Sequence, residues 1–321
     1  MELLTALQFA RGAVARKDFV PALTNFNIRN GRIKGFNGNL GLCSPIDCEF
    51  DISPHALQFI RAINACKETV ALHVAANGKL VVRSGDFKAF VDCGNPADFP
   101  DITPAGESVK LSASLLPALR YLEPFLAEDA TRPWACSVLF DGESAFATNN
   151  IVLLQYWLGF KFPRRVSIPA AAVRELLRIG EPPVRLQSDD RRLTFHYEDG
   201  RWLSTQVIES AWPDVVALLD RSPSATEPVP DGFWPALEQL LPFCDEIGRC
   251  HLLGDRLATV ADADVAGASI ALDIPGLAGC FNGRHLFLLK DVAECIDFSA
   301  YPNAVPFNGP AARGVIAGIR T

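Results

Sequence analysis

Histidine and cysteine are the residues of this sequence best suited to catalysis or metal binding, and their spacing favours neither role. The five histidines are scattered along the 321 residues, and the nine cysteines form no CxxC pair. Cys250 and His251 are adjacent, so on a strand they would point to opposite faces and could not act as a nucleophile and its base. Because zinc sites and disulfide frameworks need closer spacing, we expect reduced thiols, no metal and no cofactor.

The sequence also lacks the motifs that commonly accompany catalysis or nucleotide binding. It contains no GxGxxG, P-loop, GxSxG or HExxH segment. Asp189 and Asp190 are neighbours, but they stand between two segments of alternating apolar residues, where a turn is expected. We therefore expect a protein without enzymatic activity. The alternative of an enzyme would require a cleft of converging side chains with shifted pKa values.

The composition indicates an ordinary globular chain with an excess of acidic residues. Apolar residues make up 49% and charged residues 21%, and the formal net charge is −7. No apolar run approaches the ~18 residues that span a membrane, and the N-terminal residues lack the pattern of a signal peptide. We expect a cytoplasmic protein with no membrane partner. The negative charge argues against a simple nucleic-acid binder, unless the cations gather on one surface.

Basic residues do gather on the segments with helical periodicity. We expect helices at 3–16, 53–63, 113–126, 168–178, 233–244 and 281–292. In the fourth of these, Arg174 and Arg178 share one face and Leu176 lies on the other. The cations that we assign to this surface, on these helices or directly after the first of them, are Arg11, Lys17, Arg61, Arg120, Arg174, Arg178, Arg284 and Lys290. Their placement on an acidic chain predicts one basic surface; the alternative is a set of separately solvated helix faces.

The same order of elements occurs three times along the chain. Phe99-Pro100-Asp101 and Trp212-Pro213-Asp214 lie 113 residues apart, each after two short strands joined by a polar turn. Upstream of each lies a helix that we expect to carry a proline in its first turn, Pro54 or Pro169. A weaker third copy surrounds Asn282. Repeats of this length are domains, because solenoid units run roughly 20–50 residues. We predict domains at residues 1–104, 105–216 and 217–321.

Seven short motifs occur in these domains in a fixed order. They are Pro21–Asn25, Pro96–Pro100, Phe146–Asn150, Ile168–Pro169, Ala211–Asp214, Phe281–Asn282 and Val315–Thr321. Their order and spacing resemble those of the bacterial-type DNA sliding clamps, the beta subunits of the replicative DNA polymerase III holoenzyme. The chain departs from that family at Asn149, where an Asp is usual, and in a third domain compressed between Cys244 and Phe281. So short and divergent a clamp is compatible with a phage origin.

The resemblance implies an α+β DNA clamp fold of three tandem domains, each with two helices packed on antiparallel sheets. Two chains would join head to tail into a ring, a homodimer, with the helices and their cations lining the hole. Such a ring would encircle double-stranded DNA without reading its sequence and tether the polymerase as a processivity factor. The alternative is a protein of the clamp fold that binds partners but does not encircle DNA.

The resemblance further implies a pocket between the second and third domains for a short peptide motif of the DNA polymerase and of the clamp loader. Its lining, carried over residue by residue, is Thr148, Asn150, Ile151, Val152 and Leu153 from the second domain and Asn282, Val315, Ala317 and Ile319 from the third. We expect the pocket to depend on Leu153 and Ile319. As wall residues they should be only partly buried in the absence of the peptide.

Overall fold

The computed structural model describes residues 2–17, 19–129, 131–222, 224–262, 265–273 and 279–320. The chain divides into two compact units, which are described one at a time: residues 1–116 with 171–207, and residues 117–170 with 208–321. The predicted middle domain therefore contributes to both units, and the division into three domains stays a prediction. Pro223, beside a predicted boundary, and Thr321, the end of the last motif, lie outside the described residues.

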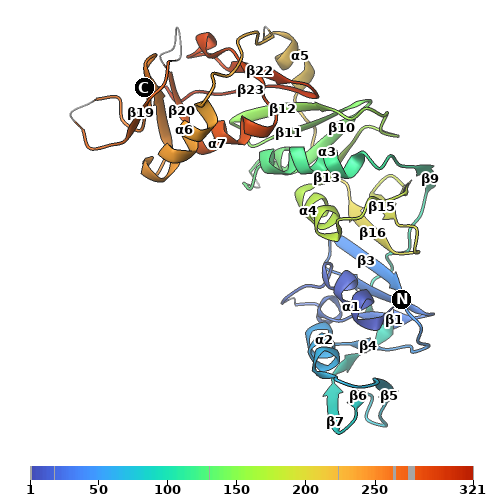
Figure 1. The fold of residues 1–321 in the computed structure, drawn as a ribbon. Coiled ribbons are helices and arrows are strands. Elements are labelled where there is room, and N and C mark those ends of the chain that lie inside the picture. The colour runs from blue at the N-terminus through green and yellow to red at the C-terminus, as the bar shows by residue number, and fades with distance from the viewer. Residues whose placement is uncertain are drawn as a thin grey trace. The chain divides into compact units, whose positions relative to one another are not determined.

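A seven-stranded antiparallel sheet is the framework of the first unit (Figure 1). Its order is β1-β2-β3-β16-β15-β14-β9. The strands are β1 (Asn27–Arg29), β2 (Arg32–Phe36), β3 (Leu40–Pro45), β9 (Glu107–Lys110), β14 (Arg185–Ser188), β15 (Arg192–His196) and β16 (Trp202–Gln206). Strands β1 to β3 come from the first repeat and the others from the second. β3 pairs with β16, which places Leu42 opposite Leu203. One hydrogen-bonded sheet thus joins two repeats.

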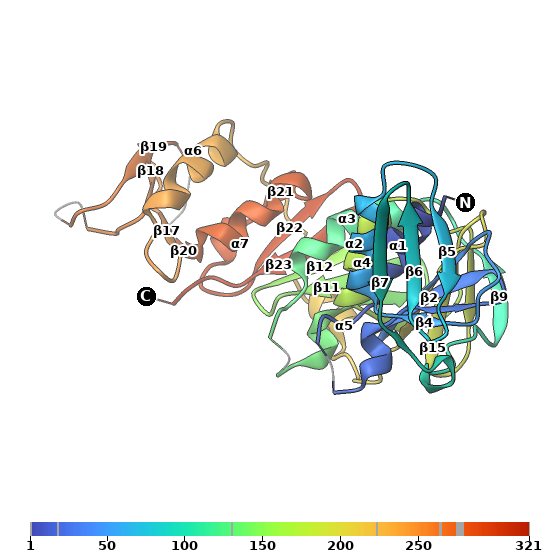
Figure 2. The ribbon, with the colours of Figure 1, turned by 90° about the horizontal axis from the view of Figure 1, so that it is seen from below.

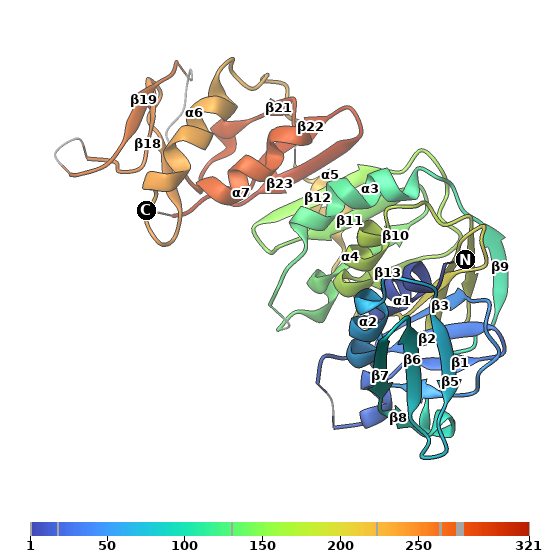
Figure 3. The same cartoon turned by 60° about the horizontal axis from the view of Figure 1, so that its bottom comes forward.

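The other elements of the first repeat complete this unit. They are α1 (Leu3–Arg11), η1 (Pro21–Thr24), β4 (Ser53–Pro54), α2 (Ala56–Ala65), β5 (Ala71–Val74), β6 (Leu80–Ser84), β7 (Phe87–Val91), β8 (Cys93–Gly94) and η2 (Pro96–Asp98). β5, β6 and β7 form a small sheet, and β4 pairs with β8. Helices α1 and α2 lie side by side (Figures 1 and 3) and bury Leu7 and Phe59 in a common core with Phe26. Their charged residues remain outside, as helical periodicity requires.

The second unit has its own seven-stranded antiparallel sheet. Its order is β13-β10-β11-β12-β23-β22-β21. The strands are β10 (Ser137–Asp141), β11 (Ser144–Thr148), β12 (Val152–Trp157), β13 (Val166–Pro169), β21 (Cys295–Ile296), β22 (Val305–Gly309) and β23 (Ala312–Ile316). Strands β10 to β13 come from the second repeat and the others from the third. β12 pairs with β23, which places Leu153 opposite Val315. Again a sheet crosses a repeat boundary.

A four-stranded sheet and several helices complete the second unit. The sheet has the order β19-β18-β17-β20 and consists of β17 (Arg249–Leu252), β18 (Arg256–Ala258), β19 (Ser269–Ala271) and β20 (Gly279–Asn282). The helices of this part are α5 (Val215–Asp220), α6 (Phe233–Leu240), η5 (Leu241–Phe243), α7 (Gly283–Phe287), η6 (Leu288–Asp291) and η7 (Phe298–Ala300). Figure 2 shows α6 and α7 side by side.

The second repeat supplies the remaining helices. They are α3 (Leu115–Leu122), η3 (Glu123–Phe125), η4 (Pro133–Cys136) and α4 (Ala170–Ile179), which continues directly from β13. In the described part of the chain, no helix is long and apolar enough to cross a membrane.

Four helices end earlier than the sequence predicts. The helix expected at 281–292 is α7, which begins at Gly283 after β20 and passes into η6 after Phe287. α1 ends at Arg11 rather than Arg16, so Lys17 lies in the loop that follows. α3 and α6 pass into 3-10 turns that contain Pro124 and Pro242. A proline cannot donate the hydrogen bond that continues an α-helix, so a tighter turn follows.

The predicted helix starts at Pro54 and Pro169 are wrong. Each proline is the last residue of a strand, β4 or β13, and the helix begins after it. The carbonyl oxygen of Pro54 accepts a hydrogen bond from the Phe26 N–H at 2.9 Å, and His55 caps α2 by accepting from the Gln58 N–H. Proline is tolerated at a strand end where no partner needs its N–H, a pairing that local sequence does not reveal.

Asn30-Gly31, between two apolar segments of the first repeat, predicts a turn between two strands. Asn30 and Gly31 join β1 to β2 with φ values of 51° and 65°. Two residues with positive φ form the turn whose twist matches that of the flanking strands, and Asn-Gly is the pair that adopts it most readily. This prediction is confirmed.

We expect Leu203→Ala to destabilise the first unit by about 2–5 kcal/mol, the usual cost of a core leucine truncation. Leu203 is buried in β16, at the strand pair that joins two repeats. Urea denaturation measures the loss. The control is Leu218→Ala on α5, where the side chain is exposed and the change should stay within about 0.5 kcal/mol. Equal effects of both variants would contradict the importance of this strand pair.

Candidate functional site

Four of the cations expected to face DNA lie on exposed positions of the first unit. Arg11 is the last residue of α1, Arg61 lies in the middle of α2, and Arg174 lies on α4. Lys17 is exposed in the loop after α1. The apolar sides of α1 and α2 are buried in their common core, so their arginines project from the outer side of the helix pair.

The side chain of Arg178 is bound to its own helix. Its Nε and Nη2 donate to the two carboxylate oxygens of Glu175 at 2.9 and 2.5 Å, and Nη2 also donates to the Phe9 carbonyl at 3.3 Å. The hydrogen bonds to Glu175 raise the pKa of the Arg178 guanidinium, so Arg178 stays ionised. Sequence periodicity places Arg178 on the face of Arg174, and the i,i+3 spacing of Glu175 was an available signal for this partner, whereas the contact with Phe9 leaves no local signal.

The second unit carries the other three cations, all of them exposed. Arg120 lies on α3, Arg284 on α7 and Lys290 on η6. Lys290 is 3.9 Å from the Glu238 carboxylate and lies over the Phe287 ring. An exposed ion pair of this length contributes little, so Lys290 can turn to another anion at low cost.

The apolar part of the expected pocket is formed by β12 and β23 in the second unit. Leu153 and Val315 lie opposite each other and are only 8% and 6% exposed. Both pack with Leu139, Phe146, Val215 and Leu219, and Trp212 covers the cluster in part. Leu153 is therefore a core residue as much as a wall of a pocket. Burial is greater than the sequence analysis expects because α5, which the sequence did not predict, packs on this face of the sheet.

The C-terminal segment is more open than the strand before it. Val152 is buried, whereas Ile319 is half-buried and Ala317 exposed. The Ala317 N–H donates to the Ile151 carbonyl at 2.8 Å, and the Ile319 N–H donates to the Cys280 carbonyl at 2.7 Å. The Tyr301 hydroxyl donates to the Ile319 carbonyl at 2.7 Å. These bonds hold the segment between the end of β20 and the start of β12.

The turn between β11 and β12 brings Thr148, Asn150 and Ile151 beside that segment. The Thr148 hydroxyl donates to the Val152 carbonyl at 2.6 Å and accepts from the Asn150 N–H at 3.1 Å. Asn149 Oδ1 accepts from the N–H groups of Ile151 and Val152 at 3.1 and 2.8 Å. Asn150 has φ 71°, a conformation that asparagine tolerates better than most residues. The side chains of Thr148 and Asn149 therefore fix the turn from within.

His285 is a residue of this site that the sequence analysis missed. Its Nδ1 lies 3.0 Å from Asn149 Nδ2, a donor, so Nδ1 acts as the acceptor and the proton resides on Nε2. Asn282, one of the expected pocket residues, accepts from the His285 N–H at the start of α7 and donates from Nδ2 to the Ile247 carbonyl. His285 comes one helical turn after Asn282, and residues at that spacing lie close together on a helix. The spacing could therefore have added His285 to the expected pocket residues.

A hollow of about 380 Å³ lies beside the apolar cluster of β12 and β23. Leu139, Phe146 and Val215 belong to both, and the rim carries an ion pair between Arg165 and Asp141 at 3.3 Å. Trp212 packs edge-on against Trp134 at this rim. The Trp-Pro-Asp motif was noted in the sequence as a repeat marker, yet it also forms a wall here.

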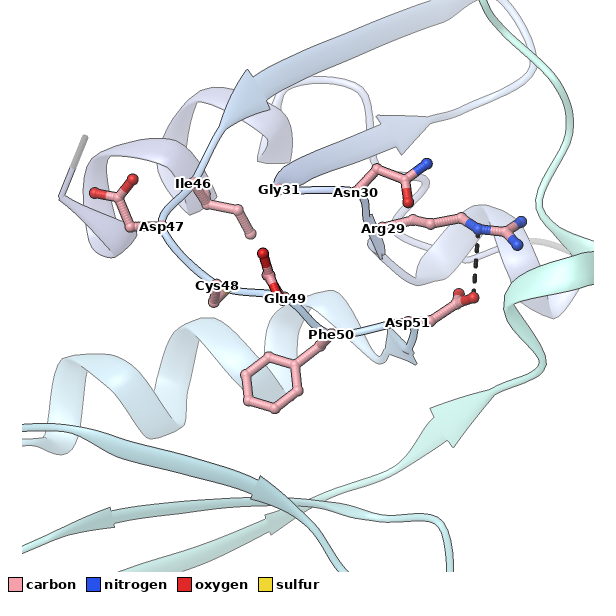
Figure 4. Close-up of a pocket in the computed structure, with 9 residues that line it drawn as sticks. All are labelled: Arg29, Asn30, Gly31, Ile46, Asp47, Cys48, Glu49, Phe50 and Asp51. Carbon is pink, nitrogen blue, oxygen red and sulfur yellow. Dashed lines mark ion pairs between the residues drawn. The ribbon is translucent and has the colours of Figure 1, made fainter.

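A second hollow, of about 720 Å³, lies in the first unit (Figure 4). It is formed by the β1–β2 turn and residues 46–51, and Arg29 pairs with Asp51 at 3.3 Å across its rim. Burial and the neighbouring Asp47 raise the pKa of the Cys48 thiol, which makes Cys48 a poor nucleophile.

All nine cysteines are free. In the described ranges, no three histidine, cysteine or acidic side chains come together in a group that could hold a metal ion.

The Asn149–His285 bond predicts a pH dependence of stability. Burial lowers the pKa of His285 in the folded protein, and protonation would set two donors against each other. The folded form thus binds fewer protons than the unfolded chain. Its contribution is complete above the ordinary histidine pKa of about 6.5 and is lost as the pH falls below that value. Thermal melting measured between pH 5 and 8 should therefore show that His285→Gln loses less stability on acidification than the wild type.

Asn149→Asp is the matched variant for this prediction. A carboxylate keeps the acceptor for the Ile151 and Val152 N–H groups and offers protonated His285 an ionic partner. The variant should lose less stability on acidification than the wild type. Identical pH profiles of all three proteins would show that His285 does not titrate with folding.

No protein-family model and no curated protein sequence matches this chain, but solved structures do. A DNA polymerase sliding clamp from Bacillus subtilis matches over 99% of this chain and 97% of its own, with a TM-score of 0.84 and 16% identity. The beta subunit of DNA polymerase from Streptococcus pyogenes has the same coverage, a TM-score of 0.83 and 18% identity. A sliding clamp, DNA polymerase III subunit beta, from Bartonella birtlesii gives the same three values. The chain therefore has the fold of the bacterial DNA polymerase III beta sliding clamps, as the order of its motifs predicted.

Proposed function

We propose that this protein is a processivity factor of DNA replication, a sliding clamp that encircles duplex DNA and tethers a polymerase. The observation that carries the proposal is the clamp fold along 99% of the chain, together with exposed cations on the helices of an acidic protein. A clamp needs no base-reading element, because phosphate contacts alone hold it on DNA. An enclosed duplex can be retained by weak contacts, which suits a chain with a net charge of −7.

Ring closure by two copies is part of the proposal. Supporting it, β5 and β7 are the edge strands of the small sheet in the described part of the first unit, and the Phe90 side chain is 53% exposed. In the second unit, Phe243 is 65% exposed next to α6, and β19 is an edge strand of its sheet as far as the described residues show. Free edges and exposed aromatic side chains favour association, and head-to-tail pairing of unlike surfaces closes when the rotation is right.

The partner site of the proposal is the surface around Ile319, Ala317 and the β11–β12 turn. Half-buried apolar residues beside backbone groups are typical of a site for a short extended peptide. The Bartonella birtlesii clamp of the same fold was solved bound to griselimycin. We infer that polymerase and clamp loader use one short motif at this surface, with His285 Nε2–H as a donor at its edge.

Topological linkage predicts how the protein leaves DNA. After assembly on a closed circular plasmid by a clamp loader, the protein should stay with the plasmid in gel filtration at moderate salt. A single restriction cut in the same plasmid should release it, because a ring can slide off an end. Retention on cut DNA equal to that on circular DNA would favour the alternative of a clamp-fold protein that does not encircle DNA.

Ile319→Ala tests the partner site. Ile319 is half-buried, so its truncation should weaken griselimycin binding by about 1–3 kcal/mol while changing the melting temperature little. Calorimetric titration measures the affinity. Leu153→Ala is the comparison, since that side chain lies in the core and should cost stability as well. Unchanged affinity in a folded Ile319→Ala protein, or no binding by the wild type, would contradict the assignment.

A further inference from the structure

The ion pair of Arg178 and Glu175 is unusual among the charges of the first unit, because its carboxylate is buried. Glu175 is 7% exposed, whereas the Arg178 side chain is 47% exposed. The guanidinium donates one hydrogen bond to each carboxylate oxygen, from Nε and from Nη2. This geometry is the strongest form of an arginine–carboxylate pair and fixes the direction of the side chain.

The pair also touches the end of α1. Arg178 Nη2 donates to the Phe9 carbonyl in the last turn of that helix. Gly12 follows α1, and a Cβ placed on it would lie 1.8 Å from Glu175 Oε1. The carboxylate therefore lies directly against the Gly12 backbone, and only glycine leaves room for it.

Electrostatics make Arg178 necessary at this contact. The C-terminal end of a helix carries unpaired carbonyl groups and a partial negative charge, so a carboxylate beside it is unfavourable. A buried carboxylate that loses its partner is costly in any position. Arg178 is the cation that meets both the Glu175 oxygens and a carbonyl of the α1 end.

Further contacts hold the same two parts together. The Phe9 and Tyr197 rings meet edge to face, and the Arg201 guanidinium lies over both. Arg201 pairs in turn with Glu181 and Asp199. Phe9 belongs to the first repeat and the other residues to the second. The α1 end is thus packed against α4 and the β15–β16 hairpin by a connected network.

We infer that Arg178 is a positioning residue rather than a phosphate contact: it holds α4 on the C-terminal end of α1 and so sets the spacing between Arg11 and Arg174. Arg11 is the last residue of α1, and Arg174 precedes Arg178 by one turn of α4. The part of the inference that concerns DNA rests on the proposed function. Within the pair the charge of Arg178 is offset by Glu175. Moving the guanidinium to a phosphate would leave that carboxylate buried without its partner.

The salt dependence of duplex binding separates the two roles. Arg61→Gln, on exposed α2 of the same unit, is the matched control and should make the slope of log affinity against log salt shallower by about 0.9 with unchanged melting. The double variant Glu175→Gln with Arg178→Gln keeps the net charge and leaves no buried carboxylate without a partner, so it should melt above Arg178→Gln alone. Made in an Arg11→Gln background, where displacement of Arg11 no longer matters, the double change should leave the salt slope as it is in Arg11→Gln. A further reduction of the slope, as in Arg61→Gln, would overturn the inference.

Arg178→Lys tests positioning itself, because lysine keeps the charge but cannot reach both carboxylate oxygens and the Phe9 carbonyl together. At fixed salt and below its melting temperature, this variant should bind duplex DNA about two- to tenfold more weakly. Arg11→Gln should cost less affinity in the Arg178→Lys background than in the wild type, because Arg11 is already displaced. Strictly additive losses would overturn the inference, since a residue that only adds stability would not couple to Arg11.

Failure of the proposed function would look different. A wild-type protein without affinity for duplex DNA would contradict the clamp proposal. The melting temperatures alone would then test the positioning role of Arg178. That role is supported if Arg178→Lys melts below the wild type and the double glutamine variant melts above Arg178→Gln. It is contradicted if either difference is absent.

Discussion

Backbone pairing between repeats is the interaction on which the rest of this structure depends. β3 pairs with β16 in the first unit, and β12 pairs with β23 in the second. Each pairing turns two short sheets from neighbouring repeats into one seven-stranded sheet. Internal strand edges that would otherwise be open are satisfied in this way, so the sheets have edges only at their ends. Neighbouring repeats are thus joined by backbone hydrogen bonds as well as by the chain itself.

The same pairing places the residues of the candidate partner site. Leu153 faces Val315 only because β12 and β23 run antiparallel in that register, and a shift by one residue would turn both side chains to the other face. Once the register is set, the chain continues past β23 and reaches the carbonyl groups of Ile151 and Cys280. The half-buried position of Ile319 therefore follows from a pairing formed several residues earlier.

Local patterns in the sequence predicted the elements that depend on nearby residues. The turn at Asn30-Gly31, the strands around Phe195 and the amphipathic course of α2 are confirmed, since each follows from periodicity or backbone preference. The order of motifs predicted the clamp fold. Local patterns failed where a distant partner decides: Pro54 ends a strand because Phe26 and β8 pair there, and α5 is fixed by packing on β10 to β12.

Arg178 is the clearest example of a residue whose role cannot be predicted from the positions of the apolar residues alone. Periodicity correctly assigns an arginine to the solvent side of an amphipathic helix, because that needs only the positions of the apolar residues. Whether the charge of that arginine is available to a ligand depends on the groups that contact its side chain. Phe9 and Gly12 lie more than 160 positions before Arg178 in the sequence. Phe9 contacts Arg178 and Gly12 contacts the buried carboxylate of Glu175, so the end of α1 lies against the ion pair. Counting cations on helix faces therefore overestimates the charge that a helix can offer to phosphates: Glu175, three residues before Arg178 on the same helix, offsets its charge, and the tertiary contacts with Phe9 and Gly12 hold the pair in place.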